Sequence, residues 1–192
     1  MSEPRKFWMR WRVRVGYPVA VIYWILARPE PRSVLIGGIV AAFGLIVRAA
    51  ASGHLQKDRA LATSGVYSRT RNPLYLGSAF LAAGFVITGQ SWWAGLLVGL
   101  YFAAFYYAVM RNEEEDLRKR FGAAYEQYAA SVPLFFPRFS EPKDHAYSSR
   151  DQAERFSWAL YRRNREYRAL VGTVAGLGVV WLRAWVRAKF GY

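Results

Sequence analysis

The side chains of this sequence that are most able to do chemistry fall into two polar clusters. One is the basic stretch from Gly65 to Gly77, and the other is the acidic run from Glu113 to Asp116. The 39 residues from Asn72 to Met110 contain no Asp, Glu, Lys or Arg. An uncharged block of that length is typical of two membrane helices joined by a short turn. Such a hairpin returns both clusters to the same membrane surface, where they can form one site.

The acidic run needs positive charge nearby, because adjacent carboxylates repel one another and a helix C-terminus disfavours negative charge. In one arrangement, Arg118 to Arg120 neutralise the run on a solvated face. In another, a cationic ligand lies between these carboxylates and the group formed by Arg69, Arg71 and Asn72. A ligand with both a positive centre and a carboxylate suits both clusters. S-adenosylmethionine, with its sulfonium, ammonium and carboxylate, is such a ligand.

The composition favours a membrane protein. Hydrophobic residues make up 54% of the chain and aromatic residues 17%, and they alternate with basic loops. The net charge of +14 also fits nucleic acid, but the basic residues lie between apolar blocks, and the Trp and Tyr residues fit interfacial belts better than a stacking platform. We therefore expect no nucleic-acid partner. With no Cys, and with His54 and His145 in no ligand pattern, we also expect no metal.

The apolar runs predict an all-α, polytopic membrane helix bundle with about five transmembrane helices and amphipathic surface helices. The expected spans are residues 15–27, 33–52, 73–87, 91–110 and 169–182. The first run is short, and it is interpreted as a membrane helix that follows an interfacial segment (1–14) rather than as a cleaved signal. Ser33 is expected to cap the second helix, and Pro73 to lie in the first turn of the third.

Two surface helices are expected beside these spans. Leu117, Phe121, Tyr125 and Tyr128 recur at helical spacing and predict an amphipathic helix along the membrane surface. A second surface helix is expected to contain the residues from Arg162 to Glu166. Together these elements predict a single domain over 1–192, with an N-terminal hairpin (1–52), a core that holds the site (53–137), and a basic surface segment with a C-terminal transmembrane helix (138–192).

The positions of Lys and Arg predict the orientation in the membrane. Five precede the first span, and the four successive connections carry two, five (with Arg48 counted in the second of them), none and twelve. With five spans and the N-terminus inside, the heavily basic segments all face the cytoplasm. A four-span chain would instead leave the C-terminus inside. The expected location is the bacterial inner membrane, with the site on the cytoplasmic side, and the sequence sets no oligomeric state.

The motifs within residues 53–137, taken in order, resemble one known family. They are Gly65-x-Tyr67, Arg71-Asn72-Pro73-x-Tyr75-x-Gly77, Glu113-Glu114-x-x-Leu117, Phe121-Gly122-x-x-Tyr125-x-x-Tyr128 and Val132-Pro133. With the apolar hairpin between them, they are similar to the integral-membrane isoprenylcysteine carboxyl methyltransferase and phospholipid methyltransferase superfamily. The resemblance implies an enzyme that transfers a methyl group from S-adenosylmethionine to a lipophilic acceptor among membrane lipids.

The resemblance also implies roles for individual residues. The cofactor-binding residues would be Tyr67, Asn72, Pro73, Tyr75, Gly77, Glu113, Glu114, Tyr125 and Tyr128. For catalysis, Arg71 or Arg111 would orient an acceptor carboxylate, or Glu113 would accept the proton of an acceptor amine. The carboxyl methyltransferases typically have His where this chain has Asn72, and the Asn version resembles phospholipid N-methyltransferases, so the acceptor stays open.

Other interpretations remain for the same residues. Pro73 and Gly77 also suit a helix start and a close approach of two backbones, and the tyrosines also suit interfacial anchors. An NADPH-dependent membrane reductase is an alternative function, because sterol reductases resemble this superfamily in their C-terminal bundle. A non-enzymatic membrane scaffold is another, and its expected feature is an acidic run that the chain itself neutralises.

Overall fold

The computed structural model describes residues 3–56, 60–138 and 156–190, and within these ranges it is helical with no strand. The all-α prediction is confirmed. The elements in order are α1 (Glu3–Leu26), α2 (Pro31–His54), the 3-10 helix η1 (Gly65–Ser68), α3 (Pro73–Gly89), α4 (Trp92–Phe121), α5 (Ala123–Ser131), α6 (Trp158–Arg163) and α7 (Tyr167–Phe190).

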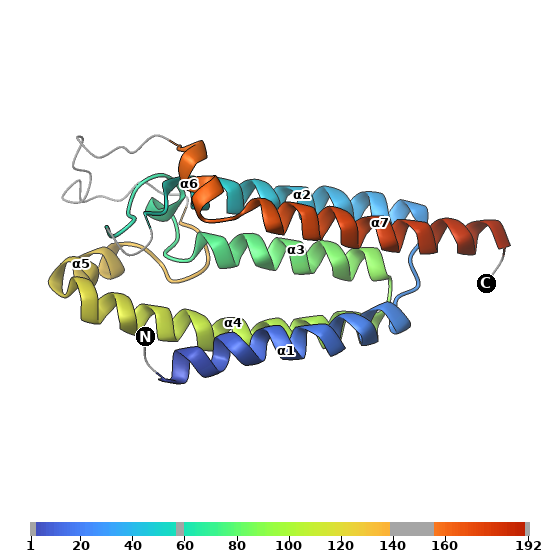
Figure 1. The fold of residues 1–192 in the computed structure, drawn as a ribbon, viewed down its shortest axis with the longest axis horizontal. Coiled ribbons are helices and arrows are strands. Elements are labelled where there is room, and N and C mark those ends of the chain that lie inside the picture. Colours follow the sequence, from blue (N-terminus) through green and yellow to red (C-terminus); the bar gives the residue numbers. More distant parts are fainter. Residues whose placement is uncertain (1–2, 57–59, 139–155, 191–192) are drawn as a thin grey trace.

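The long helices α1, α2, α3, α4 and α7 run along one common direction (Figure 1). α2, α3 and α7 lie together, and α1 runs beside α4. The short elements η1, α5 and α6 gather at one end of the bundle, which we call the polar end. Because α3 and α4 form a hairpin, the start of α3 and the charged part of α4 both lie at this end, as the sequence predicted.

α2 and α3 pack backbone to backbone through glycines. A Cβ added at Gly44 would lie 2.6 Å from the carbonyl oxygen of Gly77, and one added at Gly77 would lie 2.7 Å from that of Gly44. Gly37 and Gly84 form a second reciprocal pair, at 2.3 and 2.5 Å. Small residues let membrane helices approach closely enough for such contacts. The pairing of α2 with α3 fixes the start of α3 beside the end of α2.

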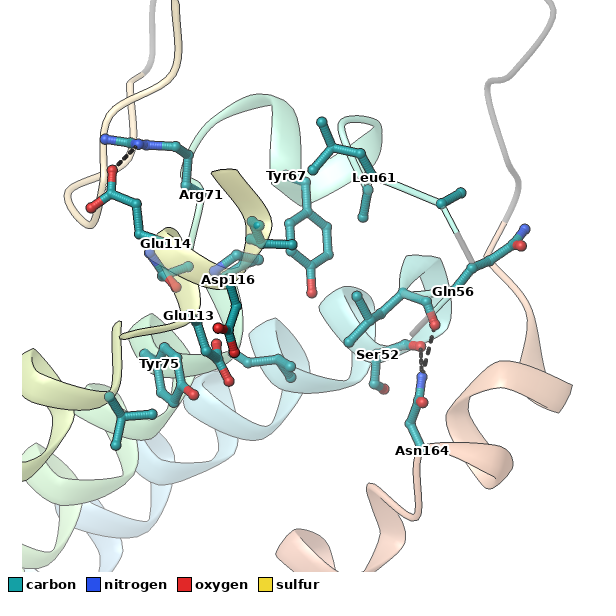
Figure 2. Close-up of a pocket in the computed structure, with 18 of the residues that line it drawn as sticks. Ser52, Gln56, Leu61, Tyr67, Arg71, Tyr75, Glu113, Glu114, Asp116 and Asn164 are labelled. Carbon is teal, nitrogen blue, oxygen red and sulfur yellow. Dashed lines mark hydrogen bonds and ion pairs between the residues drawn. The ribbon is translucent and has the colours of Figure 1, made fainter. Parts of the chain in front are cut away.

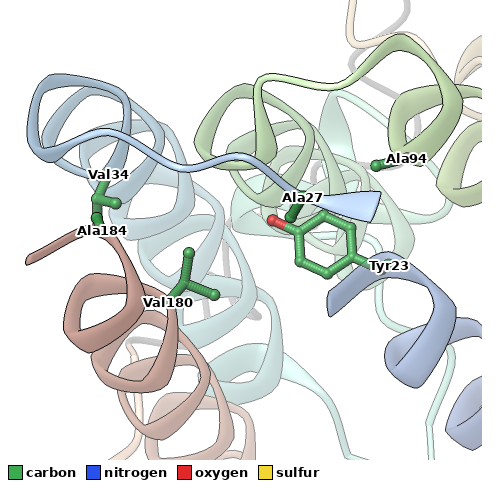
Figure 3. Packing of buried hydrophobic residues seen from close by; sticks show 6 residues of the cluster. All are labelled: Tyr23, Ala27, Val34, Ala94, Val180 and Ala184. Carbon is green, nitrogen blue, oxygen red and sulfur yellow. The ribbon is translucent and has the colours of Figure 1, made fainter. Parts of the chain in front are cut away.

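At the opposite end, which we call the far end, six buried residues of four helices form a hydrophobic cluster (Figure 3). They are Tyr23, Ala27, Val34, Ala94, Val180 and Ala184. The Tyr23 hydroxyl donates a hydrogen bond of 2.6 Å to the carbonyl of Phe85, which ties α1 to α3. Outside this cluster many large apolar side chains are exposed on the long helices. Exposed apolar surface of this extent is expected of helices in contact with lipid.

Among the described residues, α2, α4 and α7 are long and apolar enough to cross a membrane. Two shorter apolar helical segments, Val13–Leu26 and Pro73–Gly89, accompany them. The protein is therefore an integral membrane helical bundle. Two of the five predicted spans are these shorter segments, and their full crossing stays a prediction.

Several predicted boundaries are wrong. Ser33 is not the N-cap of α2: Glu30 holds that position, and its backbone N–H donates to the Ser33 hydroxyl at 3.0 Å. Residues 3–14 form one helix with the first predicted span, because α1 is continuous through them, and their interfacial position stays a prediction. The prediction that Pro73 begins α3 is confirmed.

The two predicted surface helices also differ from the structure. α4 continues past its apolar part to Phe121, and Gly122, with φ of +52°, then turns the chain into the separate helix α5. The expected single helix through Leu117 and Tyr128 is thus split by the only residue type that adopts positive φ without strain. α6 ends at Arg163, so the predicted helix through Glu166 is also shorter than expected. Residues 139–155, which include His145, lie outside the described residues.

Candidate functional site

A cavity of about 720 Å³ opens at the polar end of the bundle (Figure 2). α2 supplies its base, η1 and the start of α3 form one side, and α4 and α5 form another. The turn between α6 and α7 completes the lining. The structure thus brings both polar clusters of the sequence to one cavity.

Nine of the eleven predicted site residues line this cavity. They are Tyr67, Arg71, Asn72, Pro73, Tyr75, Glu113, Glu114, Tyr125 and Tyr128. Gly77 does not, because it faces Gly44 and the Arg48 side chain in the contact of α2 with α3. Arg111 does not line it either, and its guanidinium lies on a largely exposed part of α4. The alternative interpretation of Gly77, a close approach of two backbones, describes its position.

Asn72 joins two segments that are distant in sequence. It is the N-cap residue of α3, and its side-chain amide donates a hydrogen bond of 2.9 Å to the carbonyl of Leu134. Next to it, the backbone N–H of Arg71 donates to the carbonyl of Pro133 at 3.0 Å. The loop that follows α5 is therefore fastened to the start of α3. The motif Val132-Pro133 lies near the motif around Asn72 in space because of these bonds.

Glu114 is the most enclosed carboxylate of the acidic run. Its Oε1 accepts a bond of 2.6 Å from Arg71, and its Oε2 accepts one of 2.8 Å from Arg111. The guanidinium of Arg118 lies 3.7 Å from Oε1. The arrangement in which basic residues of the chain offset the acids is therefore realised at Glu114. It uses Arg71 and Arg111 as well as Arg118 of the predicted group from Arg118 to Arg120.

Two buried tyrosines of α5 close the cavity on one side. The Tyr128 hydroxyl donates a hydrogen bond of 2.7 Å to the carbonyl of Tyr67, and the Tyr125 hydroxyl accepts one of 3.2 Å from Arg71. Burial raises the pKa of both Tyr67 and Tyr128 well above the ordinary value of 10.0 for a phenol. Both phenols thus remain neutral hydrogen-bonding groups across the physiological range, and neither acts as a base.

Glu113 and Asp116 present carboxylates to the cavity from one face of α4. Figure 2 shows them directed into the pocket, near Tyr75 of α3. The ring of Tyr75 packs edge-on against Tyr106 at a centroid distance of 5.6 Å, and Tyr106 stacks on Phe102 at 4.1 Å. This wall therefore combines negative charge with aromatic faces, and both are features that attract cations.

The sequence profile of the phospholipid methyltransferase family matches residues 32–124, from the start of α2 to the start of α5. This segment is similar to the isoprenylcysteine carboxyl and phospholipid methyltransferase superfamily. The superfamily predicted from the motifs is confirmed. The match begins earlier than the motifs do, because it includes α2, and it ends just before Tyr125.

Three relatives match part of this chain. The nickel-cobalt-cadmium resistance protein NccN of Alcaligenes xylosoxydans xylosoxydans is 35% identical over 85 residues, and the cobalt-zinc-cadmium resistance protein CzcN of Cupriavidus metallidurans is 36% identical over 85 residues. Each match covers 44% of this chain and 39% of the relative. The protein-S-isoprenylcysteine O-methyltransferase of Schizosaccharomyces pombe is 35% identical over 81 residues, which is 42% of this chain and 34% of the yeast protein. The matched part thus spans about two fifths of the first two relatives, and no solved structure matches the chain significantly.

The motifs missed several charged residues that line the same cavity, among them Arg48 and Glu166. The guanidinium of Arg48 in α2 bonds the Glu166 carboxylate at 2.5 Å and the Ser78 hydroxyl at 2.5 Å. A lone arginine inside an apolar run is a recognised signal of a functional or structural site in a membrane helix, so Arg48 was detectable from the sequence. Glu166 was not, because it lies in a basic segment beyond the methyltransferase segment and reaches the site only through the turn before α7.

The segment around α6 covers the end of α2. The side-chain amide of Asn164 donates bonds of 2.9 and 3.0 Å to the carbonyls of Ser52 and Leu55 (Figure 2). These carbonyls belong to the last turn of α2, where backbone acceptors have no partner within the helix. The C-terminal part of the chain thus contributes to the cavity wall as well as a membrane helix.

Proposed function

We propose that the protein is a membrane methyltransferase that uses S-adenosylmethionine and acts on a lipophilic acceptor. The observation that carries the proposal is the cavity that joins both polar clusters within the methyltransferase segment. Its lining continues from the polar loops to α2, α3 and α4, all of them apolar helices of the bundle. Such a position lets a soluble cofactor and an acceptor from the membrane meet at one site.

The cavity fits S-adenosylmethionine in size and chemistry. Its volume of about 720 Å³ lies in the range of small-molecule sites, roughly 300–1,000 Å³. The buried Nε of Arg71 has no hydrogen-bond partner, which leaves a donor for the carboxylate of the ligand. Glu113 and Asp116 would hold the ammonium or ribose hydroxyls, and the ring of Tyr75 would face the positive centre. These contacts need both clusters, as the sequence predicted.

S-adenosylmethionine supplies an electrophilic methyl group on its sulfonium. The residues of the chain would bind it, orient the acceptor and exclude water, which is the main requirement of a direct in-line transfer. α5 shields one side of the cavity with the buried cluster of Tyr125, Tyr128 and Val132. For an amine acceptor, Glu113 is the base we assign, because it lines the cavity.

The predicted roles of the two catalytic arginines change with this geometry. Arg71 already bonds Glu114 and Tyr125 through Nη1, so only its Nε would reach a ligand. Arg111 lies outside the cavity, and we assign it to the support of Glu114. Orientation of an acceptor carboxylate, if the acceptor has one, would pass to Arg48, which lines the membrane side of the cavity.

The test is transfer of a labelled methyl group by the purified full chain in liposomes. The acceptors offered are a total lipid extract and a prenylated cysteine analogue, and product identity distinguishes carboxyl from amine methylation. We expect Glu113→Gln to lower the rate at least tenfold, and Glu115→Gln, at an exposed position of the same run, to leave it unchanged. If the wild type fails to bind S-adenosylmethionine, the proposal is wrong. In that case NADPH oxidation in the same liposomes tests the reductase alternative, and inactivity in both assays leaves a scaffold.

We further propose that the cavity faces the cytoplasm of a bacterial cell from the inner membrane. The proposal rests on the distribution of Lys and Arg, most of which lie in the connections at the polar end. Because the chain has no cysteine, single cysteines introduced at Gln127 and at Gln90 can be labelled without background. A reagent that does not cross membranes should label Gln90→Cys in whole cells and Gln127→Cys only after lysis. The reverse pattern would refute this orientation.

A further inference from the structure

The far end of the bundle holds an arginine whose charge no carboxylate of the described residues offsets. Arg183 lies within the membrane helix α7, and its buried Nη1 has no hydrogen-bond partner. Its one defined contact is with the ring of Trp24 in α1, whose centroid lies 4.6 Å from the guanidinium carbon. A contact with an aromatic face attracts a cation but leaves its charge in place. The contact with Trp24 thus holds the guanidinium in position, and its Nη1 has no hydrogen-bond partner.

The surroundings of Arg183 add positive charge. The described residues at this end include the basic residues Arg28, Arg32, Arg187 and Lys189, and only one acidic residue, Glu30. Neither Arg28 nor Arg32 forms an ion pair with Glu30 in the structure, and the described ion pairs all lie at the polar end or at the Arg48 site. The far end therefore attracts anions, and it does so on the opposite side of the bundle from the cavity.

Arg183 lies in the last third of α7, near one end of this candidate membrane helix. Seven residues separate it from Phe190, the last residue of α7, which corresponds to about 10 Å of helix. An arginine side chain at that depth reaches toward the membrane surface while its methylenes stay among apolar groups. Trp24 and Trp185, each about half exposed, lie on the same part of the bundle. Tryptophan at such a level is typical of the boundary between acyl chains and headgroups.

The packing around Arg183 makes this a built position rather than a mobile surface charge. Val180 and Ala184, which lie one turn before it and directly after it, are buried in the cluster with Tyr23, Ala27 and Val34 (Figure 3). α7 is thereby fixed against α1 and α2, and the guanidinium is fixed over Trp24. A planar fork held in one orientation is the arrangement that recognises a phosphate through two oxygens at once.

We propose that Arg183 is the centre of a binding site for the phosphate of an anionic phospholipid, between α1 and α7 at the far end. The lipid phosphate accepts hydrogen bonds from the partly buried guanidinium of Arg183, its acyl chains lie along the exposed apolar faces of α7, and Arg187 adds further attraction. An anionic lipid fits better than a zwitterionic one because the site has no acid to receive a cationic headgroup. The site is distinct from the proposed methyl-transfer cavity and does not depend on that function.

The test compares lipid retention by the full chain purified in detergent. The variants are Arg183→Gln, Arg183→Lys and, as a matched control, Arg32→Gln, which removes an exposed charge at the same end. Phosphatidylglycerol and phosphatidylcholine are offered in equal amounts, and bound lipid is counted by native mass spectrometry. We expect the wild type and Arg32→Gln to retain phosphatidylglycerol at least tenfold over phosphatidylcholine, and Arg183→Gln to lose this preference. Arg183→Lys should keep a reduced preference, because the ammonium retains the charge without the planar fork.

Thermal unfolding separates the site from a structural role of Arg183. Without lipid, Arg183→Gln should unfold at the same temperature as the wild type or higher, because it removes an uncompensated charge. With phosphatidylglycerol, only the wild type and Arg32→Gln should gain stability, and S-adenosylmethionine binding should be the same in all variants. Equal retention of the two lipids, equal losses in Arg32→Gln, or a lower unfolding temperature of lipid-free Arg183→Gln would each overturn the proposal. Equal stabilisation by inorganic phosphate alone would do so too, since it would show an anion site with no need of lipid.

Discussion

Replacing Glu114 by alanine should destabilise the polar end of the bundle far more than replacing its neighbour Glu115. The Glu114 side chain is 5% exposed and its partner Arg71 is 13% exposed, so the substitution leaves a nearly buried guanidinium without its carboxylate. Removing one partner of a buried ion pair costs about 3–5 kcal/mol. Arg111 and Arg118 are 55% and 45% exposed, so each adds at most about 1 kcal/mol. Because Arg71 keeps its hydrogen bond to Tyr125, we expect the lower end of the range, about 3 kcal/mol.

The assay is equilibrium unfolding of the purified chain in mixed micelles. Glu115→Ala, at an exposed position, should change the free energy of unfolding by less than about 0.5 kcal/mol. The double variant Arg71→Met with Glu114→Leu removes both buried charges and should recover most of the loss, because apolar replacements of a buried pair are often neutral. If Glu114→Ala is as stable as Glu115→Ala, or if the double variant is less stable than Glu114→Ala, the reasoning about this ion pair is refuted.

The same variants separate two roles for Glu114, which the motif comparison expected to hold the cofactor. If Glu114 acts only by holding Arg71 in position, the double variant recovers stability but loses the Arg71 donor. The affinity for S-adenosylmethionine should then fall as much in Arg71→Met alone as in the double variant. If Glu114 contacts the cofactor itself, Glu114→Gln should lower affinity while the free energy of unfolding changes little. Titration of S-adenosylmethionine into each variant distinguishes the two outcomes.

Three further predictions follow from the packing and the hydrogen bonds. Gly84→Ala should lower stability by about 1–3 kcal/mol, because its methyl group would overlap the backbone of α2. The control Gly99→Ala meets nothing within 4 Å and should be neutral or slightly stabilising. Thermal unfolding checks both variants. Tyr128→Phe should cost about 1–3 kcal/mol by leaving the Tyr67 carbonyl unpaired. Folding raises the Tyr128 pKa, so the stability contributed by its neutral phenol is present below pH 10 and is lost as pH rises above it. Tyr128→Phe should therefore lose less stability than the wild type in alkaline unfolding curves. An equal loss would contradict the assignment. Asn72→Asp should weaken S-adenosylmethionine binding more than Asn72→Ala does, because a carboxylate would face the Leu134 carbonyl that the Asn72 amide now bonds. Equal effects in a binding titration would show that this hydrogen bond is not needed.

The parts of the fold that were predictable have a strong local signal. The α3–α4 hairpin follows from one uncharged block, and Pro73 begins α3 because its missing N–H is unpaired in a first turn anyway. The break at Gly122 was harder to predict, because the apolar spacing of Leu117, Phe121 and Tyr125 continues across it. Apolar periodicity predicts which side chains share a helix face, but it does not predict that one residue, Gly122, adopts a positive φ and separates two helices.

The parts of the candidate site that were not predictable depend on contacts between distant segments. Glu166 pairs with Arg48 only because the turn before α7 covers the end of α2, and no local sequence pattern in this basic segment predicts that contact. Gly77 was assigned to the cofactor from its place in a motif, yet a glycine in a membrane helix has packing as its commonest use. Motif position thus selected residues that mostly line one cavity, tertiary packing decided which of them do, and their role in binding a cofactor stays a prediction.

The acidic run shows how one helix divides four similar residues among different tasks. Each step along α4 rotates the side chain by about 100°, so Glu113 and Asp116, three apart, share a face, while Glu114 and Glu115 point elsewhere. The cavity-lining residues of α4 include Tyr106, Val109, Glu113, Asp116, Leu117 and Arg120, and Glu114 lines the cavity beside them. The Glu114 carboxylate pairs with Arg71, whose buried Nε has no hydrogen-bond partner. The four negative charges are thereby divided between Glu113 and Asp116 as a ligand-facing pair, Glu114 as an internal counterion and Glu115 as a solvated residue. Substitutions of Glu113 and Asp116 should therefore affect ligand binding, those of Glu114 should affect stability, and those of Glu115 should affect neither.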